Sequence, residues 1–219
     1  MENKQFIKVW NLAIRVFHWT LVGCFTLAFI SSEDITNLHV IFGYGVLALV
    51  VFRIFYGFAG TRYTRFSDFL YRPAEIAGYL KGLASGRPRH YIGHNPAGGL
   101  MIAVLLLSLL TLTLTGLKAY GVKGHGPLAK YEISFASKAF ADNDEEGQSE
   151  DHNGRSRRGK EFSASEDDEK DEFWEEVHET IAYFTLFLAS VHVAGALISS
   201  ILHRENLIKA MITGRRQVV

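Results

Sequence analysis

The sequence contains a single cysteine, Cys24, among its 219 residues. One thiol cannot form an intramolecular bridge, so a disulfide framework is excluded. The chain also lacks a glycine-rich nucleotide fingerprint, a metal-hydrolase motif and a paired nucleophile and base. It has no net charge, and no nucleic-acid partner is expected. Because 48% hydrophobic content also suits a soluble protein, the lengths of the apolar runs must decide the class.

Acidic and basic residues are absent from Thr180–Leu202. Three other apolar stretches also reach the length of a membrane span: Leu12–Ile30, Leu38–Gly60 and Pro96–Leu117. In lipid only helices and closed barrels satisfy their backbone groups, and uninterrupted apolar runs favour helices. We therefore expect an all-α fold, a four-helix transmembrane bundle.

Basic residues are also absent from the first connection, Ser31–Asn37, which carries Glu33 and Asp34. They gather in the amino-terminal flank, the second connection and the tail: Lys4, Lys8, Arg15, Arg62, Arg65, Arg72, Lys81, Arg87, Arg89, Arg204, Lys209, Arg215 and Arg216. The positive-inside rule then places both termini of a multi-pass membrane protein in the cytoplasm. The alternative is a cleaved signal peptide, since two serines follow the first apolar run, and cleavage there would remove His18.

The predicted organisation has three parts. Residues 1–119 hold the first three spans with a cytoplasmic connection over 61–95, residues 120–176 form an external connection, and residues 177–219 hold the fourth span and a cytoplasmic tail. The cytoplasmic connection suits either a short interfacial helix or a solvated linker. The segment from Asp142 to Glu176 contains 15 acidic and five basic residues. This composition cannot bury a core, so we expect a long acidic external loop that is partly disordered.

Histidines inside membrane spans are uncommon and usually functional. His178 and His192 lie 14 residues apart. At the helical period this spacing places both side chains on the same helix face, about 21 Å apart along the axis. His39 opens the second span on the outer side, and His18 lies near the inner end of the first. Matching depths pairs His39 with His178 at an outer site and His18 with His192 at an inner site.

Two opposed imidazoles suit the two axial positions of haem iron. Zinc sites need further Cys, Asp or Glu ligands, which these two sites do not offer. No C-x-x-C-H motif is present, so c-type attachment is excluded and two haems b are expected. Gly43 and Gly195 lie close after His39 and His192, where a flat macrocycle needs clearance, although glycine is also common at helix contacts in membranes.

A family resemblance is carried by residues on all four spans: Val9, Trp10, Arg15, Phe17, His18, Trp19, Leu38, His39, Val40, Gly43, Tyr44, Gly93, His94, Asn95, Pro96, Gly98, Gly99, His178, Glu179, Thr180 and His192. In combination they resemble the bacterial cytochrome b561 family, which includes the b-type subunits of nickel-iron hydrogenases. The resemblance implies two haems b ligated by histidines of the first, second and fourth helices. On this chain those ligands are His18, His39, His178 and His192. Asn11 and Ala13 stand where many members have Asp and Pro, and the acidic loop is longer than in minimal members.

Three further residues are candidates for the cofactor site. His94 could serve a quinone headgroup or a haem propionate, and the alternative is a residue that merely starts the third helix. Arg15 shares a helix side with His18, and Arg53 lies near the inner end of the second span. Either arginine could pair with propionates of the inner haem. The alternative for both is snorkelling to cytoplasmic headgroups.

The expected function is transmembrane electron transfer. The haems would exchange electrons between the quinone pool and a basic periplasmic cytochrome c or a reductase, with quinone oxidoreductase activity as a further expectation. Alternatives are the membrane anchor of a hydrogenase, a superoxide oxidase and a haem-free cation transporter. A homodimer is compatible with the sequence.

Overall fold

The computed structural model describes residues 5–32, 36–61, 64–85, 91, 93–129, 155–202 and 206–218. The contacts between residues divide the chain into two compact units. The first comprises Met1–Leu110 with Phe184–Val219, and the second comprises Thr111–Tyr183. The two units are described separately below.

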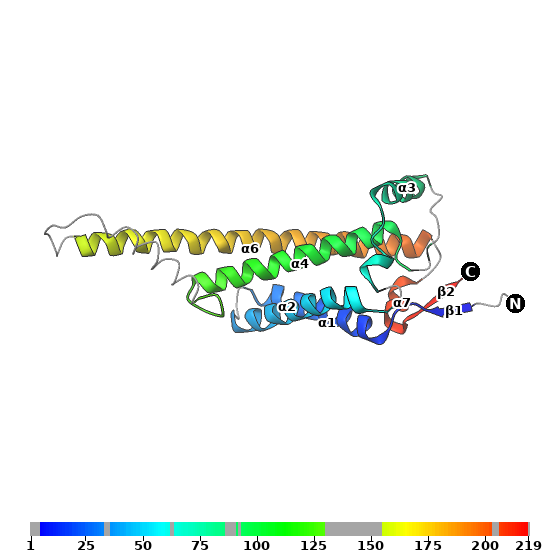
Figure 1. The fold of residues 1–219 in the computed structure, drawn as a ribbon, viewed down its shortest axis with the longest axis horizontal. Coiled ribbons are helices and arrows are strands. Elements are labelled where there is room, and N and C mark those ends of the chain that lie inside the picture. The colour runs from blue at the N-terminus through cyan, green and yellow to red at the C-terminus, as the bar shows by residue number, and fades with distance from the viewer. Residues whose placement is uncertain are drawn as a thin grey trace. The chain divides into compact units, whose positions relative to one another are not determined.

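The elements follow in the order β1 (Gln5–Lys8), α1 (Leu12–Ile30), α2 (Thr36–Ala59), the 3-10 turn η1 (Phe66–Asp68), α3 (Pro73–Ala84), α4 (Pro96–Val122), α6 (Arg155–Leu202), α7 (Leu207–Thr213) and β2 (Arg215–Val218) (Figure 1). Four stretches have the length and hydropathy of membrane spans: Leu12–Ile30, Asn37–Ala59, Pro96–Val122 and Glu172–Leu202. The prediction of a helical protein with four spans is confirmed. The short strands β1 and β2 are an addition that the all-α prediction did not include.

The helix α6 begins earlier than expected. The sequence places its start near Val177, whereas the helical backbone begins at Arg155. The long, partly disordered acidic loop stays a prediction. Glu, Lys and Arg are good helix formers, and a charged segment can continue a helix outside the bilayer without burying a core. The rest of the predicted acidic loop, residues 130–154, lies outside the described residues.

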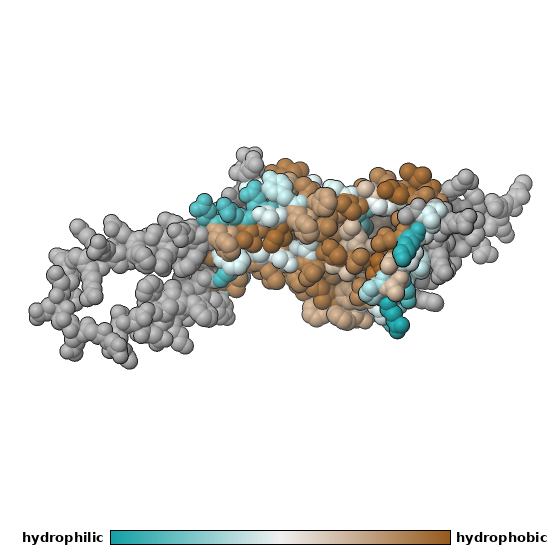
Figure 2. Space-filling model, turned by 90° about the horizontal axis from the view of Figure 1, so that it is seen from above, coloured by the Kyte–Doolittle hydropathy of each residue, from teal (hydrophilic) through white to brown (hydrophobic). Residues whose placement is uncertain are grey.

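Side chains on the spans are mostly apolar and exposed. Examples are Ile30 at 70% exposure, Phe55 at 71% and Ile201 at 76%. Figure 2 shows hydrophobic residues over much of the described surface. A water-soluble monomer rarely exposes so much contiguous apolar surface, whereas lipid covers it without cost.

The helix α1 is capped by Asn11, one of the two residues at which the chain departs from the family pattern. The Asn11 Oδ1 accepts from the Ile14 N–H at 3.0 Å, and its Nδ2 donates to Thr61 Oγ1 at 3.1 Å and to the Tyr56 hydroxyl. Asparagine is a favourable N-cap. The start of α1 is therefore tied to the end of α2, on which it packs (Figure 1).

The two chain ends meet in the first unit. The strands β1 and β2 pair antiparallel, with Gln5 opposite Val218 and Lys8 opposite Arg215. Gly214 ends α7 with φ +77°, and its carbonyl accepts from the Val9 and Trp10 N–H groups at 3.0 and 3.2 Å. A Cβ at Gly214 would lie 2.6 Å from the Trp10 carbonyl oxygen. Both the left-handed backbone and the close approach therefore require glycine here.

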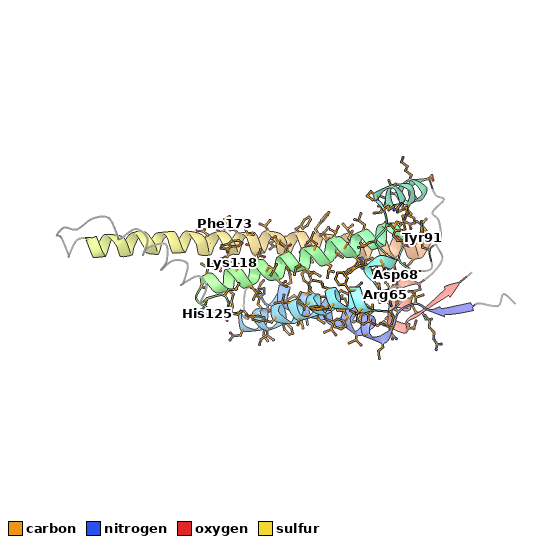
Figure 3. The ribbon with its side chains drawn as sticks, viewed as in Figure 1. Arg65, Asp68, Tyr91, Lys118, His125 and Phe173 are labelled. Atoms are coloured by element: carbon orange, nitrogen blue, oxygen red, sulfur yellow. The ribbon has the colours of Figure 1, made fainter. Side chains whose placement is uncertain are left out.

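Polar contacts join α4 to α6 within each unit. In the first, the buried hydroxyls of Ser108 and Thr185 hydrogen-bond at 2.6 Å. In the second, Lys123 forms an ion pair with Glu175, and the Lys118 ammonium lies 5.7 Å from the Trp174 ring centre. Lys118 lies toward the carboxyl end of α4 in Figure 3. Hydroxyl pairs between membrane helices are a known source of helix association.

Candidate cofactor site

His39 lies near the start of α2, and its ring is held by a backbone carbonyl. Its Nδ1 is 2.9 Å from the carbonyl oxygen of Ala28 on α1. A carbonyl only accepts, so Nδ1 must carry the proton and Nε2 keeps its lone pair. This is the tautomer of a histidine that binds a metal through Nε2 while a second residue orients the ring.

His178 has the same arrangement within the second unit. Its Nδ1 lies 3.1 Å from the carbonyl oxygen of Leu112 and 3.3 Å from Thr115 Oγ1, both on α4. The nearby carbonyl again requires a proton on Nδ1 and leaves the lone pair on Nε2. The two histidines of the predicted outer site therefore have the same tautomer, with the proton on Nδ1.

His18 and His192 both belong to the first unit. They are close enough for the charges of the two imidazoles to interact. The His18 Nδ1 is buried without a hydrogen-bond partner among the described residues, and the ring meets Trp19 edge-on at 5.2 Å. A buried polar atom without a partner is costly, so it favours a group that would bind there.

The structure thus brings the two histidines of the inner pair together. His39 belongs to the first unit and His178 to the second, so their pairing still depends on their depths along the sequence. The helix α6 is continuous through His178 and His192, as the shared helix face of these two residues requires.

A Cβ built at Gly43 or at Gly195 of the first unit would meet nothing within 4 Å. The clearance for a flat ring at these positions stays a prediction. Among the described residues no three His, Cys, Asp or Glu side chains gather as a metal site. Pairs of imidazoles remain the donor set, and they fit the two axial positions of a haem b.

Arg53 is a buried cation on α2, with 5% of its surface exposed. Its guanidinium lies over the rings of Phe66 and Phe69, 5.4 and 5.5 Å from their centres. The Nη1 is buried without a hydrogen-bond partner among the described residues. The aromatic rings stabilise the charge in part, but an anionic oxygen would satisfy the free N–H groups.

Arg15 is placed differently. Its Nη2 donates to the Ile212 carbonyl at the end of α7, and its side chain lies beside Gly214. The Nε is buried without a hydrogen-bond partner in the described part of the chain. Arg15 therefore helps to hold the carboxyl-terminal segment against α1, and its pairing with a propionate stays a prediction.

His94 lies between two aromatic rings just before α4. Its ring centre is 4.5 Å from that of Trp10 and 5.1 Å from that of Phe69. The Tyr71 hydroxyl donates to the His94 carbonyl at 3.1 Å. Partial burial raises the pKa of the Tyr71 phenol, and the neighbouring Tyr91, Glu75 and Asp68 raise it further. The phenol therefore remains protonated at neutral pH and can donate.

The turn before α4 is held by a side-chain hydrogen bond and by a close backbone contact. Asn95 Oδ1 accepts from the Gly98 N–H at 2.6 Å, and Gly99 lies against the Phe69 backbone with no room for a Cβ. His94 is thus both a residue at the start of a helix and part of an aromatic cluster with Trp10 and Phe69. Sequence reasoning did not assign Phe66, Phe69, Thr115 or Gly116 to the cofactor site.

Comparison with known proteins gives one match. The model of a family described as prokaryotic cytochrome b561 matches residues 9–214. This range contains all four spans and the four histidines considered above. No curated protein and no solved structure matches the chain.

Proposed function

This chain belongs to the prokaryotic cytochrome b561 family, and from that premise we propose that it carries two haems b and transfers electrons between the quinone pool and a periplasmic redox partner. The family consists of b-type membrane cytochromes in electron transfer. The observation that supports the outer haem is the tautomer of His39 and His178, since each donates Nδ1–H to a carbonyl, as metal-binding histidines do. The inner haem is proposed from the His18 and His192 pair.

The four histidines would act as two axial pairs. His39 and His178 form the outer pair, and His18 with His192 forms the inner pair. A haem held by two imidazoles supplies a one-electron Fe(III)/Fe(II) couple. Gly43 and Gly195 leave room beside the helices, and the Ala28 and Leu112 carbonyls hold the rings of the outer pair.

Charged and aromatic residues at the inner end would complete the site. The buried Arg53 Nη1 has no hydrogen-bond partner in the described part of the chain, which suits an anionic propionate of the inner haem. We assign His94 to the quinone headgroup. It is flanked by the Trp10 and Phe69 rings, which offer flat apolar surfaces of the kind that quinone sites need.

The orientation in the membrane follows from charge and from the chain ends. The pairing of β1 with β2 supports termini on one side of the bilayer. The basic residues of the flank, the 61–95 connection and the tail assign that side to the cytoplasm of the inner membrane.

Purified protein in detergent is expected to contain two haems b per chain and to be reduced by a soluble quinol. Haem extraction into pyridine gives the ratio of haem to protein, and the absorbance change on adding quinol gives the reduction. One haem or none per chain would contradict the di-haem proposal. Two haems that quinol does not reduce would contradict the quinone assignment alone.

The external partner is proposed to be a basic protein, because the segment before the fourth span is strongly acidic. Glu172, Glu175, Glu176 and Glu179 on α6 are exposed. Such a surface speeds encounter with a cation and repels the superoxide anion. This favours a cytochrome c over superoxide as the partner.

Neutralising Glu166, Asp167, Asp168 and Glu169 together is expected to slow electron exchange with a basic cytochrome c about tenfold at low salt. The dependence on ionic strength should become shallower, and both haems should remain. Stopped-flow rates at two ionic strengths measure this. The control is Asp68→Asn with Glu75→Gln, two exposed acids assigned to the cytoplasmic side. Unchanged exchange with faster superoxide consumption would instead favour an oxidase.

A further inference from the structure

One turn of α4 lies directly against the imidazole of His178. The contacts come from three residues of the second unit. The Leu112 carbonyl and Thr115 Oγ1 lie 3.1 and 3.3 Å from Nδ1. A Cβ built at Gly116 would lie 2.8 Å from His178 Cε1 and 3.2 Å from Nδ1.

The Thr115 hydroxyl is oriented by its own helix. It lies 3.0 Å from the carbonyl oxygens of both Thr111 and Leu112, to which its single O–H donates. A lone pair of Oγ1 is then left for the His178 Nδ1–H. The proton on Nδ1 is therefore shared between the Leu112 carbonyl and the Thr115 hydroxyl.

Gly116 sets how closely the ring approaches α4. A side chain of any size would overlap the edge of the imidazole between Nδ1 and Nε2, at a distance that real Cβ atoms do not adopt. Glycine in a helix interior costs about 1 kcal/mol relative to alanine. At this position the lost propensity is compensated by the close approach of the ring to the backbone.

We infer that Thr115 and Gly116 are positioning residues for His178. They determine the rotation of its ring and the strength of its electron donation to the outer haem iron. The inference rests on the proposed function, in which His178 is an axial ligand. Neither residue touches the iron. Both act through the imidazole, as outer partners of metal-binding histidines generally do.

The expected sign of the effect follows from the hydrogen bond. A bond accepted from Nδ1–H makes an imidazole a stronger donor, and a stronger donor favours Fe(III) over Fe(II). Thr115→Val removes part of that bond and keeps the shape of the side chain. The reduction potential of one haem should therefore rise, while the other stays at its original value.

The measurement is a redox titration of the purified holoprotein, followed by haem absorbance. Thr115→Val should keep two haems and shift one midpoint upward, and Thr115→Ser should return it close to that of the parent protein. Thr111→Val is the matched control, since it removes an exposed hydroxyl one turn earlier on the same helix. Two unshifted midpoints in Thr115→Val, or an equal shift in Thr111→Val, would overturn the inference.

Gly116→Ala tests the close approach independently. The added methyl group should rotate or displace the imidazole, which should change the low-spin electron paramagnetic resonance signal of one haem or lower its occupancy. The control is Gly78→Ala on α3, where a Cβ meets nothing within 4 Å. Spectra of Gly116→Ala identical to those of the parent protein would overturn the part assigned to Gly116.

His178→Ala separates this inference from the proposed function. If it keeps two haems per chain, His178 is not a ligand, and both the proposed function and this inference fail. If it loses one haem while Thr115→Val shifts neither midpoint, the proposed function stands and the inference alone is wrong.

Discussion

Alanine at His178 or at His192 is expected to lower the haem content from two per chain to one. Each substitution removes one of two axial ligands, and a haem b has no covalent attachment to hold it afterwards. The two variants should lose different haems, because the histidines are about 21 Å apart along α6. Pyridine extraction gives the number of haems, and a redox titration identifies which one remains.

Double variants test how the ligands pair. His39→Ala with His178→Ala should still leave one haem, because both residues are assigned to the outer site. His178→Ala with His192→Ala should leave none. His125→Ala is the control, since that exposed histidine follows α4 and stacks on Tyr120 (Figure 3). Loss of both haems in the first double variant would show that the depth assignment is wrong.

Arg53→Leu is expected to weaken binding of the inner haem by about a hundredfold. Removing one partner of a buried charge pair costs about 3 kcal/mol, because the other charge is left uncompensated. The stability of the haem-free protein, in contrast, should not fall. This protein loses a buried guanidinium whose Nη1 has no hydrogen-bond partner among the described residues, so it should be at least as stable as the parent.

Haem titration and thermal unfolding of the haem-free protein measure the two effects separately. Arg53→Lys should keep part of the affinity, since the charge remains while the planar donor fork is lost. Arg72→Leu is the control, because its side chain is exposed and makes no capping hydrogen bond at α3. Equal haem affinity in Arg53→Leu and the parent would exclude Arg53 as a propionate partner. An unstable haem-free Arg53→Leu would instead assign Arg53 to packing between Phe66 and Phe69.

Much of the secondary structure could be predicted from the sequence. The first span was expected at Leu12–Ile30, where α1 lies, and α4 begins at Pro96 as expected. Long apolar runs determine such helices because lipid accepts no unsatisfied backbone. The start of α6 was missed by 22 residues, since hydropathy marks only where a helix enters the membrane, while a charged helix can continue beyond it.

The four histidines were also selected from the sequence alone, because an imidazole in an apolar span is conspicuous and the helical period gives its face. Only the tertiary structure showed what orients them. The partners of His39 and His178 are the carbonyls of Ala28 and Leu112. Every residue has a backbone carbonyl, so the sequence alone cannot indicate which carbonyl will contact a histidine from another helix.

The same reason applies to the contacts around Arg53, Gly116 and Gly214. The aromatic rings over Arg53 come from the connection after α2, and the ring against Gly116 comes from α6. The carbonyl of Gly214 joins the carboxyl terminus to the start of the chain. Local composition and periodicity determined the spans of this protein and the histidines that are its candidate ligands. The packing of segments far apart in the chain decided the tautomers, the buried charge and the pairing of its ends.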